Sequence, residues 1–329
     1  MSYNKEDYIR IKREFSQKYL AAQSEAKERS LELYAKIPEV RQLDAVLGRT
    51  GMDIMAVVTS GGDTEAKLAE IRRRNDQLLE ARKQLLLAAG YPENYSDIRY
   101  SCEKCGDTGF VDTKMCDCMK RALVEAGYES SGLGALIRSQ SFENFSLDYY
   151  RTGGANEDAM RIAAEGLRRF AEQFSKDTYR NYLLIGSTGL GKTHLSTSVA
   201  KVVIERGFDV AYVTAVGMFG DFNAKQFDKG VGMKNDPDRY FEAELLIIDD
   251  LGTEMTNQFT VSCLYDLINH RINNRLSTFI NTNLSFRELE SRYSERITSR
   301  ILGEFHPILF AGQDVRRQKI QKQAGSAFR

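Results

Sequence analysis

The 329-residue sequence carries no excess of charge of either sign, because 46 lysines and arginines are balanced by 46 aspartates and glutamates. This balance excludes a protein that binds nucleic acid as a uniform polycation, so any such contact must come from a local patch. No apolar run approaches the roughly 18 residues that a membrane-spanning helix needs, and no basic-then-apolar signal segment opens the chain. We therefore expect a cytoplasmic protein with no membrane partner.

Histidine and cysteine are also scarce, which narrows the metal and catalytic chemistry open to the chain. The three histidines, His194, His270 and His306, form no constellation, and His194 is most simply interpreted as a helix-surface residue. One cysteine, Cys263, stands alone, while the other four lie between positions 102 and 118. In a reducing compartment, such clustering indicates a metal site rather than disulfides.

The cysteine cluster consists of a Cys102-x-x-Cys105 pair and a Cys116-x-Cys118 pair. A Cys-x-x-Cys turn lets two thiolates face one tetrahedral ion, and the residues between the pairs are enough for a small hairpin to return the second pair. An unoccupied thiol cluster or a redox pair is the alternative, since Cys-x-Cys departs from the commoner spacing. We expect structural Zn²⁺ here, with no position open for catalysis.

What the sequence does contain is a phosphate-binding pattern, Gly186-x-x-x-x-Gly191-Lys192-Thr193, directly after an apolar run over 182–185. The glycines let consecutive N–H groups turn toward phosphate oxygens, and a helix that starts at Lys192 adds its N-terminal dipole. Lys192 would reach the β- and γ-phosphates, and the Thr193 hydroxyl would ligate Mg²⁺. The expected nucleotide-binding residues are Gly186, Ser187, Thr188, Gly189, Leu190, Gly191, Lys192, Thr193 and His194.

A pair of acids follows the apolar run Leu245–Ile248. An acid at the carboxyl end of a buried strand is the Walker B arrangement, in which Asp249 would lie near Mg²⁺ and Asp250 would face the water in line with the γ-phosphate. The pattern is weak by itself. It becomes strong because it follows a phosphate-binding loop with one strand between them.

The spacing of apolar residues predicts two kinds of structure. In the first hundred residues, charged segments with apolar residues every three or four positions predict long helices over 5–36 and from Asp63 or Thr64 to about 89. We expect these helices to pack as an antiparallel hairpin, with an intermolecular coiled coil as the alternative. Further on, five short apolar runs alternate with helices and predict an α/β fold with a five-stranded parallel sheet. The runs lie at 182–185, 210–214, 245–248, 277–283 and 307–310.

Together these motifs resemble the DnaC/DnaI-type replicative helicase loaders of the AAA+ class, with the IstB-type transposition-helper ATPases as near relatives. The helices and the cysteine module are similar to the partner-binding N-terminal region of Gram-positive-type loaders. The resemblance covers about residues 140–320. It rests on the phosphate-binding loop, Asp249-Asp-Leu-Gly-Thr-Glu254, Thr282-Asn-Leu-Ser285 and Glu295-Arg-Ile-Thr-Ser-Arg300.

The resemblance implies roles that spacing alone does not assign. Asn283 takes the sensor 1 position near the γ-phosphate, and Arg316 takes the sensor 2 position. Arg300 is the arginine finger that reaches the ATP of a neighbouring copy, with Arg296 as the alternative, because a planar cation suits the charge on a transferring phosphoryl group. The competing interpretation of both finger candidates is a solvated helix face, in which arginines alternate with glutamates.

The function implied by the resemblance is that of an ATP-dependent helicase loader in DNA replication. ATP and Mg²⁺ would control self-assembly and release, the N-terminal module would bind the replicative helicase, and the ATPase domain would bind single-stranded DNA. Many AAA+ proteins carry Glu where this chain has Asp250, so we expect slow hydrolysis, stimulated by assembly or DNA, unless Glu254 assists. The alternatives are an IstB-like ATPase that assists a transposase, a small-molecule P-loop kinase or metabolic NTPase, and a zinc-dependent adaptor with a vestigial ATPase.

The DNA contact and the division into domains follow from the same interpretation. Aromatic and basic residues between Gly217 and Tyr240 would stack on bases and bind phosphates, while burial of the rings in a core is the alternative. These residues are Phe219, Phe222, Lys225, Phe227, Lys229, Lys234, Arg239 and Tyr240. The expected parts are a helical partner-binding region over 1–100, a four-cysteine zinc-binding module over 101–130, a linker over 131–155, an AAA+ ATPase domain over 156–313 and a flexible basic tail over 314–329.

Overall fold

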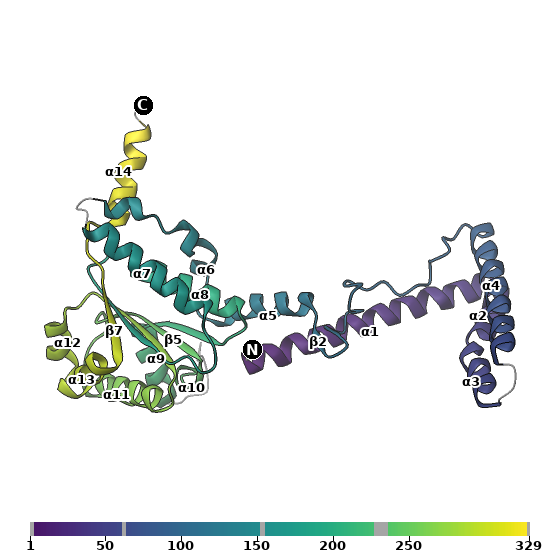
Figure 1. Cartoon of the computed structure of the whole chain (residues 1–329), viewed down its shortest axis with the longest axis horizontal. Coiled ribbons are helices and arrows are strands. Elements are labelled where there is room, and N and C mark those ends of the chain that lie inside the picture. Colours follow the sequence, from purple (N-terminus) through teal and green to yellow (C-terminus); the bar gives the residue numbers. More distant parts are fainter. Residues whose placement is uncertain (1–2, 61–63, 152–154, 227–235, 328–329) are drawn as a thin grey trace. The chain divides into compact units, whose positions relative to one another are not determined.

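The computed structural model describes residues 3–60, 64–151, 155–226 and 236–327 (Figure 1). The chain forms two compact units. The helical unit is Lys12–Met119, and the sheet unit is Met1–Ile11 together with Lys120–Arg329. Within the described ranges, no helix combines the length and the apolar character that a membrane crossing requires.

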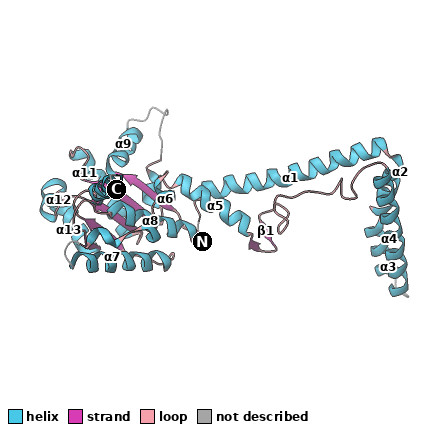
Figure 2. Ribbon diagram, turned by 90° about the horizontal axis from the view of Figure 1, so that it is seen from above, coloured by secondary structure: helices cyan, strands magenta, loops and turns pink. Residues whose placement is uncertain are grey.

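The helical unit contains most of helix α1, the helices α2 to α4 and a small antiparallel hairpin. Helix α4 lies alongside α2 and α3 (Figures 1 and 2). It meets the C-terminal end of α1 in a cluster formed by Leu33, Ile37, Val40 and Leu86. The bounds are α1 Lys5–Lys36, α2 Pro38–Leu47, α3 Thr50–Ser60, α4 Thr64–Ala88, β1 Phe110–Val111 and β2 Lys114–Met115.

The prediction that the two long helices pack as an antiparallel hairpin is wrong. Both helices are present, but α4 has α2 and α3 as its neighbours along its length. Pro38, the first residue of α2, has no N–H and cannot continue the hydrogen bonding of α1, so the chain turns there. Helix α3 was not expected, and its Val57 faces the same cleft as Ile71 of α4. Ile71 and Leu78 in the apolar seam of α4 are half-buried.

The sheet unit is built on a parallel sheet, of which β5 and β7 are labelled in Figure 1. Its five strands lie in the order β4-β5-β6-β3-β7. This confirms the predicted α/β fold. Side chains of β5 alternate between two cores, because Leu245 and Ile247 pack with α7 and α8 whereas Leu246 and Ile248 pack with α9 and α11. The bounds are β3 Asn181–Ile185, β4 Val210–Thr214, β5 Leu245–Leu251, β6 Ser277–Thr282 and β7 Phe305–Leu309.

Helices cover both faces of this sheet, as its two cores require. Two short 3₁₀ helices, η1 (Phe142–Asn144) and η2 (Leu147–Tyr150), lie between α6 and α7. The bounds of the helices are α5 Asp117–Ser130, α6 Leu136–Ser139, α7 Ala155–Glu172, α8 Lys192–Glu205, α9 Ala215–Gln226, α10 Asp238–Glu242, α11 Gln258–Asn273, α12 Phe286–Tyr293, α13 Glu295–Glu304 and α14 Val315–Ala327.

Two segments that were expected to lie outside the ATPase domain are built into the sheet unit. Residues 131–151 are not a loose linker, because Leu133 and Tyr150 are buried in the core that α7 and α8 share. Residues 152–154 of the expected linker lie outside the described residues. Burying a large apolar side chain stabilises a fold by roughly 1.5–3 kcal/mol, which explains why this segment is ordered. The expected flexible basic tail instead forms helix α14 over Val315–Ala327, and the N–H of Val315 donates to the carbonyl oxygen of Gly189 (3.0 Å).

Candidate functional site

The phosphate-binding loop leaves β3 at Ile185 and enters α8 at Lys192. Gly189 (φ 82°) and Gly191 (φ 87°) adopt left-handed backbone conformations that other residues rarely take. A Cβ atom on Gly191 would also lie 2.7 Å from the Tyr150 hydroxyl. The loop can therefore curl at the N-terminus of α8, where free N–H groups and the helix dipole favour an anion.

Lys192 is buried at the base of this loop. Its Nζ donates to the carbonyl oxygens of Gly186 (2.6 Å) and Ser187 (2.9 Å). Burial lowers the pKa of Lys192, and the charges of Asp250 and Asp249 oppose that shift. Phosphate oxygens could replace the two carbonyls as acceptors, since a charged acceptor makes the stronger hydrogen bond to an ammonium group.

Asp249 and Asp250 lie at the end of β5, where the strand bulges. Over these residues β5 advances by three positions while β6 advances by two, so one residue is extra and the alternation of side chains is broken. Asp250 has a left-handed backbone (φ 54°). Both acids line one cavity with Lys192 and Thr193, which we call the P-loop cavity. Burial, and then the charge of Asp249, raises the pKa of Asp250.

Several donors surround the buried Asp249 carboxylate. Thr193 Oγ1 lies 3.0 Å from its Oδ2 and 3.2 Å from its Oδ1. Asn281 Nδ2 donates to Oδ1 (2.8 Å), as does the N–H of Asp250 (3.1 Å), and the Tyr212 hydroxyl donates to Oδ2. A carboxylate beside a threonine hydroxyl is a donor set that fits Mg²⁺, which binds proteins through one or two carboxylates and keeps several waters.

Tyr212 and Asn281 were not predicted as site residues. Both lay inside apolar runs assigned to strands, at 210–214 and 277–283. The signal for Asn281 was its polarity within a buried strand, because a buried amide needs hydrogen-bond partners. Tyr212 offered no comparable signal, since tyrosine is common in strands and its hydroxyl usually finds a partner of some kind.

The residues assigned to sensor and finger roles lie in different places. Arg316 of α14 lines the P-loop cavity. Asn283 follows the last residue of β6, is exposed and is not among the described residues of the cavity wall. Arg296 and Arg300 lie on α13, also outside that described wall, and Arg300 Nη2 lies 3.3 Å from the Tyr265 hydroxyl. Neither α13 arginine therefore lines the described part of the P-loop cavity in its own chain.

Residues 136–150 form the opposite wall of the P-loop cavity, whose volume is about 420 Å³. Phe145 and Tyr149 supply aromatic surface there, which suits a nucleobase. The expectation that His194 is a helix-surface residue is wrong. Its Nε2 lies 2.8 Å from the carbonyl oxygen of Ser141, its ring meets Phe145 edge on, and burial lowers its pKa. His194 therefore links α8 to the segment that contains Ser141 and Phe145.

Two further expectations, assistance by Glu254 in hydrolysis and base stacking by Phe219 and Tyr240, are wrong because these residues are buried in the core of the sheet unit. Glu254 is not a spare base, since its two carboxylate oxygens accept hydrogen bonds from the Gly252 N–H (2.9 Å) and the Tyr293 hydroxyl. Phe219 and Tyr240, proposed to stack on DNA bases, are buried under the sheet. Of the other candidates, Phe222 packs against the same core, Lys225 forms ion pairs with Asp236 and Asp238, and Arg239 forms one with Asp209. Phe227, Lys229 and Lys234 lie outside the described residues.

The four clustered cysteines of the helical unit lie close enough to share one ion. Their sulfur atoms are all within 4.8 Å of one another, with 3.9 Å between Cys102 and Cys116 and 3.5 Å between Cys105 and Cys118. Tetrahedral Zn²⁺ with Zn–S bonds of about 2.3 Å places sulfurs roughly 3.8 Å apart. Asp107 fixes the turn by accepting the N–H of Cys102 (2.8 Å). The donor set therefore fits structural Zn²⁺.

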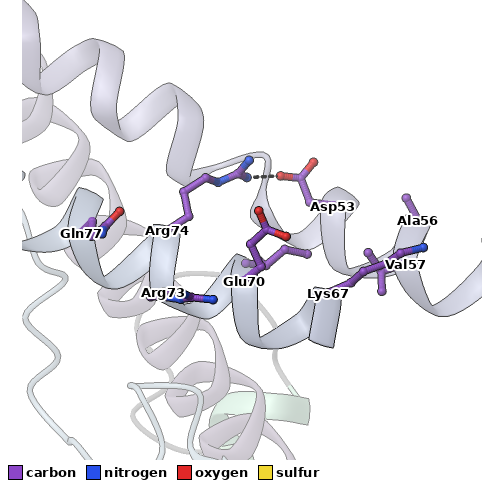
Figure 3. A pocket seen from close by; sticks show the side chains of 9 residues that line it. Asp53, Ala56, Val57, Lys67, Glu70, Arg73, Arg74 and Gln77 are labelled. Atoms are coloured by element: carbon purple, nitrogen blue, oxygen red, sulfur yellow. Dashed lines mark hydrogen bonds and ion pairs between the residues drawn. The ribbon is translucent and has the colours of Figure 1, made fainter. Parts of the chain in front are cut away.

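A second cavity lies in the helical unit, between α3 and α4 (Figure 3). Its volume is about 690 Å³, and Lys67 and Glu70 of α4 border it. Arg74 of α4 forms an ion pair with Asp53 of α3 across its edge. Helix α3 also exposes apolar side chains at intervals of three residues: Met52, Met55 and Val58. Exposed methionines on a helix are typical of adaptable binding surfaces.

Residues 142–323, in the sheet unit, match the protein family described as IstB-like ATP binding protein. Among individual proteins, the replicative helicase loader DnaC of Buchnera aphidicola is 22% identical over 172 residues. That alignment covers 52% of this chain and 66% of the loader, so the chain spans a little under two thirds of that relative's length. A putative ATP-binding protein in an insertion sequence of Mycobacterium tuberculosis is 24% identical over 231 residues, which cover 68% of this chain and 88% of that protein.

Two solved structures align with about half of this chain. The crystal structure of the DnaC helicase loader aligns with a TM-score of 0.42 and 23% identity, over 52% of this chain and 98% of that one. The crystal structure of DnaI aligns with a TM-score of 0.45 and 22% identity, over 55% of this chain and 92% of that one.

Proposed function

The chain belongs to the family of IstB-like ATP binding proteins, and from this premise we propose that it is an ATP-dependent loader of a replicative helicase. One observation carries the proposal: a single cavity is lined by Lys192, Thr193, Asp249, Asp250 and Arg316. These are the side chains that bind, orient and hydrolyse a nucleoside triphosphate in P-loop proteins. The helical unit, with its cysteine cluster and exposed α3 face, supports a separate role in holding a partner.

The chemistry assigned to the cavity is a slow hydrolysis of ATP. Lys192 and Arg316 would bind the phosphate oxygens, and Asp250 would orient the attacking water and receive its proton. Bound Mg²⁺ supplies charge neutralisation at the β- and γ-phosphates, and Thr193 and Asp249 would hold it. Asp250, whose side chain is one methylene shorter than that of glutamate, would act without Glu254, which is engaged in the core. This supports an ATP-controlled switch rather than a high-flux enzyme.

Self-assembly on ATP is the second part of the proposal. Arg300 and Arg296 lie on α13, outside the described wall of the cavity in their own chain, so either could act only on a neighbour's ATP. Arg300→Ala should keep ATP affinity and lose the rise of turnover with protein concentration. Arg296→Ala is the matched control on the same helix. If Arg300→Ala retained that rise while Arg296→Ala lost it, the finger would be Arg296, and if both retained it, catalysis in trans would be excluded.

The partners proposed are the replicative helicase for the helical unit and single-stranded DNA for the sheet unit. The three exposed apolar residues of α3 support a protein contact. DNA binding is supported by the resemblance to helicase loaders, and the burial of Phe219 and Tyr240 removes two of the four stacking rings first considered for it.

Assistance to a transposase is a second candidate function. One observation favours it, because the alignment with the insertion-sequence protein extends over more of this chain than the alignment with the DnaC loader does. Loading a helicase and assisting a transposase share the ATP chemistry and differ in the partner, so partner binding separates them.

The experiment is co-elution of the full, zinc-loaded chain with the replicative helicase and with a candidate transposase of the same organism, with and without ATP. Stable co-elution with the helicase supports the loader, and co-elution with the transposase alone replaces it by the second candidate. A variant with Met52, Met55 and Val58 changed to serine should lose the complex. Leu20→Ser on α1, which removes an equally exposed apolar side chain, is the control and should retain it. Lys192→Ala with undiminished ATP affinity would refute the nucleotide site itself.

A further inference from the structure

We propose that Tyr212 is a positioning residue whose hydroxyl holds the Asp249 carboxylate in the orientation that binds Mg²⁺ together with Thr193. The inference rests on the proposed function, because it presumes that Mg²⁺ and ATP bind in the P-loop cavity. The juxtaposition behind it is direct, since the hydroxyl of Tyr212 on β4 donates to Oδ2 of Asp249 on the neighbouring strand β5.

The hydroxyl of Tyr212 is not needed to fill the core. Its ring packs among the residues that α7 and α8 cover, and the residue is 9% exposed. Phenylalanine would occupy nearly the same volume, whereas a buried phenol requires a hydrogen-bond partner. Tyr212 also lines the P-loop cavity, so its polar end lies where the metal-binding carboxylate is set.

A carboxylate needs such a constraint because the terminal torsion of aspartate has broad minima. Asn281 Nδ2 donates to Oδ1 of Asp249, and the same amide nitrogen donates to Ser196 Oγ (2.8 Å). Tyr212 donates to the other oxygen, Oδ2. Two donors on two different oxygens fix the rotation of the group.

The third side-chain donor to Asp249 is Thr193, whose hydroxyl would also have to ligate the metal. Thr193 now donates its hydroxyl proton toward both carboxylate oxygens. To ligate Mg²⁺, this hydroxyl oxygen must turn a lone pair toward the ion. Tyr212 and Asn281 are the side-chain donors that would have no second task at the ion, and the carboxylate has lone pairs enough to accept both and face the ion.

Tyr212 itself is fixed through its backbone. Its N–H donates to the carbonyl oxygen of Ser131 (2.7 Å), so the chain that follows α5 covers the open edge of β4 at this residue. A Cβ atom on Gly132 would lie 2.4 Å from the Tyr212 carbonyl oxygen, which shows how closely the two backbones approach. Arg239 ties the same segment down by donating to the carbonyl oxygens of Ser130 and Val210.

The test is a titration of a fluorescent ATP analogue into the full chain, first in EDTA and then over a range of Mg²⁺ concentrations. Tyr212→Phe should leave the affinity in EDTA within about twofold of wild type, because the ring and the phosphate loop are intact. The Mg²⁺ concentration at half-maximal effect should rise by about tenfold, the usual consequence of losing one hydrogen bond to a charged group. Mn²⁺ binding followed by electron paramagnetic resonance should weaken in parallel.

Tyr182→Phe is the matched control, because it removes the hydroxyl of a half-buried tyrosine on β3 of the same sheet and should change neither quantity. An unchanged Mg²⁺ midpoint in Tyr212→Phe would overturn the inference. A loss of ATP-analogue affinity in EDTA as large as the loss in Mg²⁺ would overturn it too. Gly132→Ala should raise the midpoint as well, and an unchanged value would exclude the anchoring role of the segment. Failure of the wild-type chain to bind the analogue at all would instead refute the proposed function.

Discussion

Replacing Arg271 by methionine should destabilise the sheet unit without touching the nucleotide site. Arg271 is 1% exposed, and its guanidinium donates to Thr278 Oγ1 (2.9 Å) and to the carbonyl oxygens of Tyr240 (2.9 Å), Ala243 (2.9 Å) and Ser277 (2.7 Å). Methionine fills a similar volume but supplies no donor, so these acceptors lose their partner at a cost of about 1 kcal/mol or more each.

Part of this cost is offset, because burial of the charge is itself unfavourable and lowers the pKa of Arg271 to about 9. We expect a net loss of about 2–4 kcal/mol in the free energy of unfolding. For a unit of this size, each kcal/mol lowers the melting temperature by about 2–4 °C, so thermal unfolding should begin about 5–15 °C lower. Circular dichroism or scanning calorimetry measures this shift.

Two variants test the reasoning. Arg271→Lys keeps the charge without the planar fork of donors and should melt between the methionine variant and wild type. Arg287→Met removes an exposed arginine of α12 and should change the free energy of unfolding by about 0.5 kcal/mol at most. A melting temperature for Arg271→Met within about 2 °C of wild type would refute the claim that the buried carbonyls depend on the guanidinium.

Three further changes have expected outcomes in both units. Cys105→Ser should abolish zinc retention, which plasma mass spectrometry measures. The variant should also lose the cooperative unfolding of the helical unit. A zinc content equal to that of wild type would contradict the metal assignment. Arg316→Ala should weaken ATP binding by about tenfold. The side chain of Arg317 is 86% exposed, so Arg317→Ala should leave ATP binding unchanged. Equal losses of affinity in the two variants would remove the sensor role of Arg316. The hydrogen bond from Lys36 lowers the pKa of Glu32 to about 2 from its ordinary 4.5, so ionised Glu32 stabilises the fold above that ordinary value and this contribution disappears as the pH falls toward 2. Glu32→Gln should therefore flatten the melting temperature between pH 4.5 and 2, and an unchanged slope would contradict it.

Much of the sheet unit could be predicted from sequence because its strands are short, apolar and closed by informative residues. The run over 182–185 is followed by glycines that other residues cannot replace in a left-handed turn, and the run over 245–248 is followed by two acids. Patterns of this kind are local, so they need no knowledge of what packs against them.

The parts that sequence did not predict depend on contacts between distant segments. Tyr212 looks like any strand tyrosine until β4 is placed beside β5. Residues 131–155 resemble a linker until Leu133 and Tyr150 meet the core of α7 and α8. Helix α3 has few charges to mark its exposed side, so its apolar residues show no clear helical period. The pairing of α4 with α2 and α3 is likewise decided by packing.

The bulge at the end of β5 explains why this chain has Asp250 where many AAA+ proteins have glutamate. The extra residue leaves position 250 with a positive φ of 54°, a conformation in which aspartate and asparagine are several-fold enriched and longer side chains are not. The identity of the second acid is thus coupled to strand register. An engineer who introduced glutamate at position 250 to speed hydrolysis would meet a backbone penalty of about 1 kcal/mol before any catalytic gain. A longer acid at position 250 would be easier to accommodate if the bulge, and with it the positive φ, were removed.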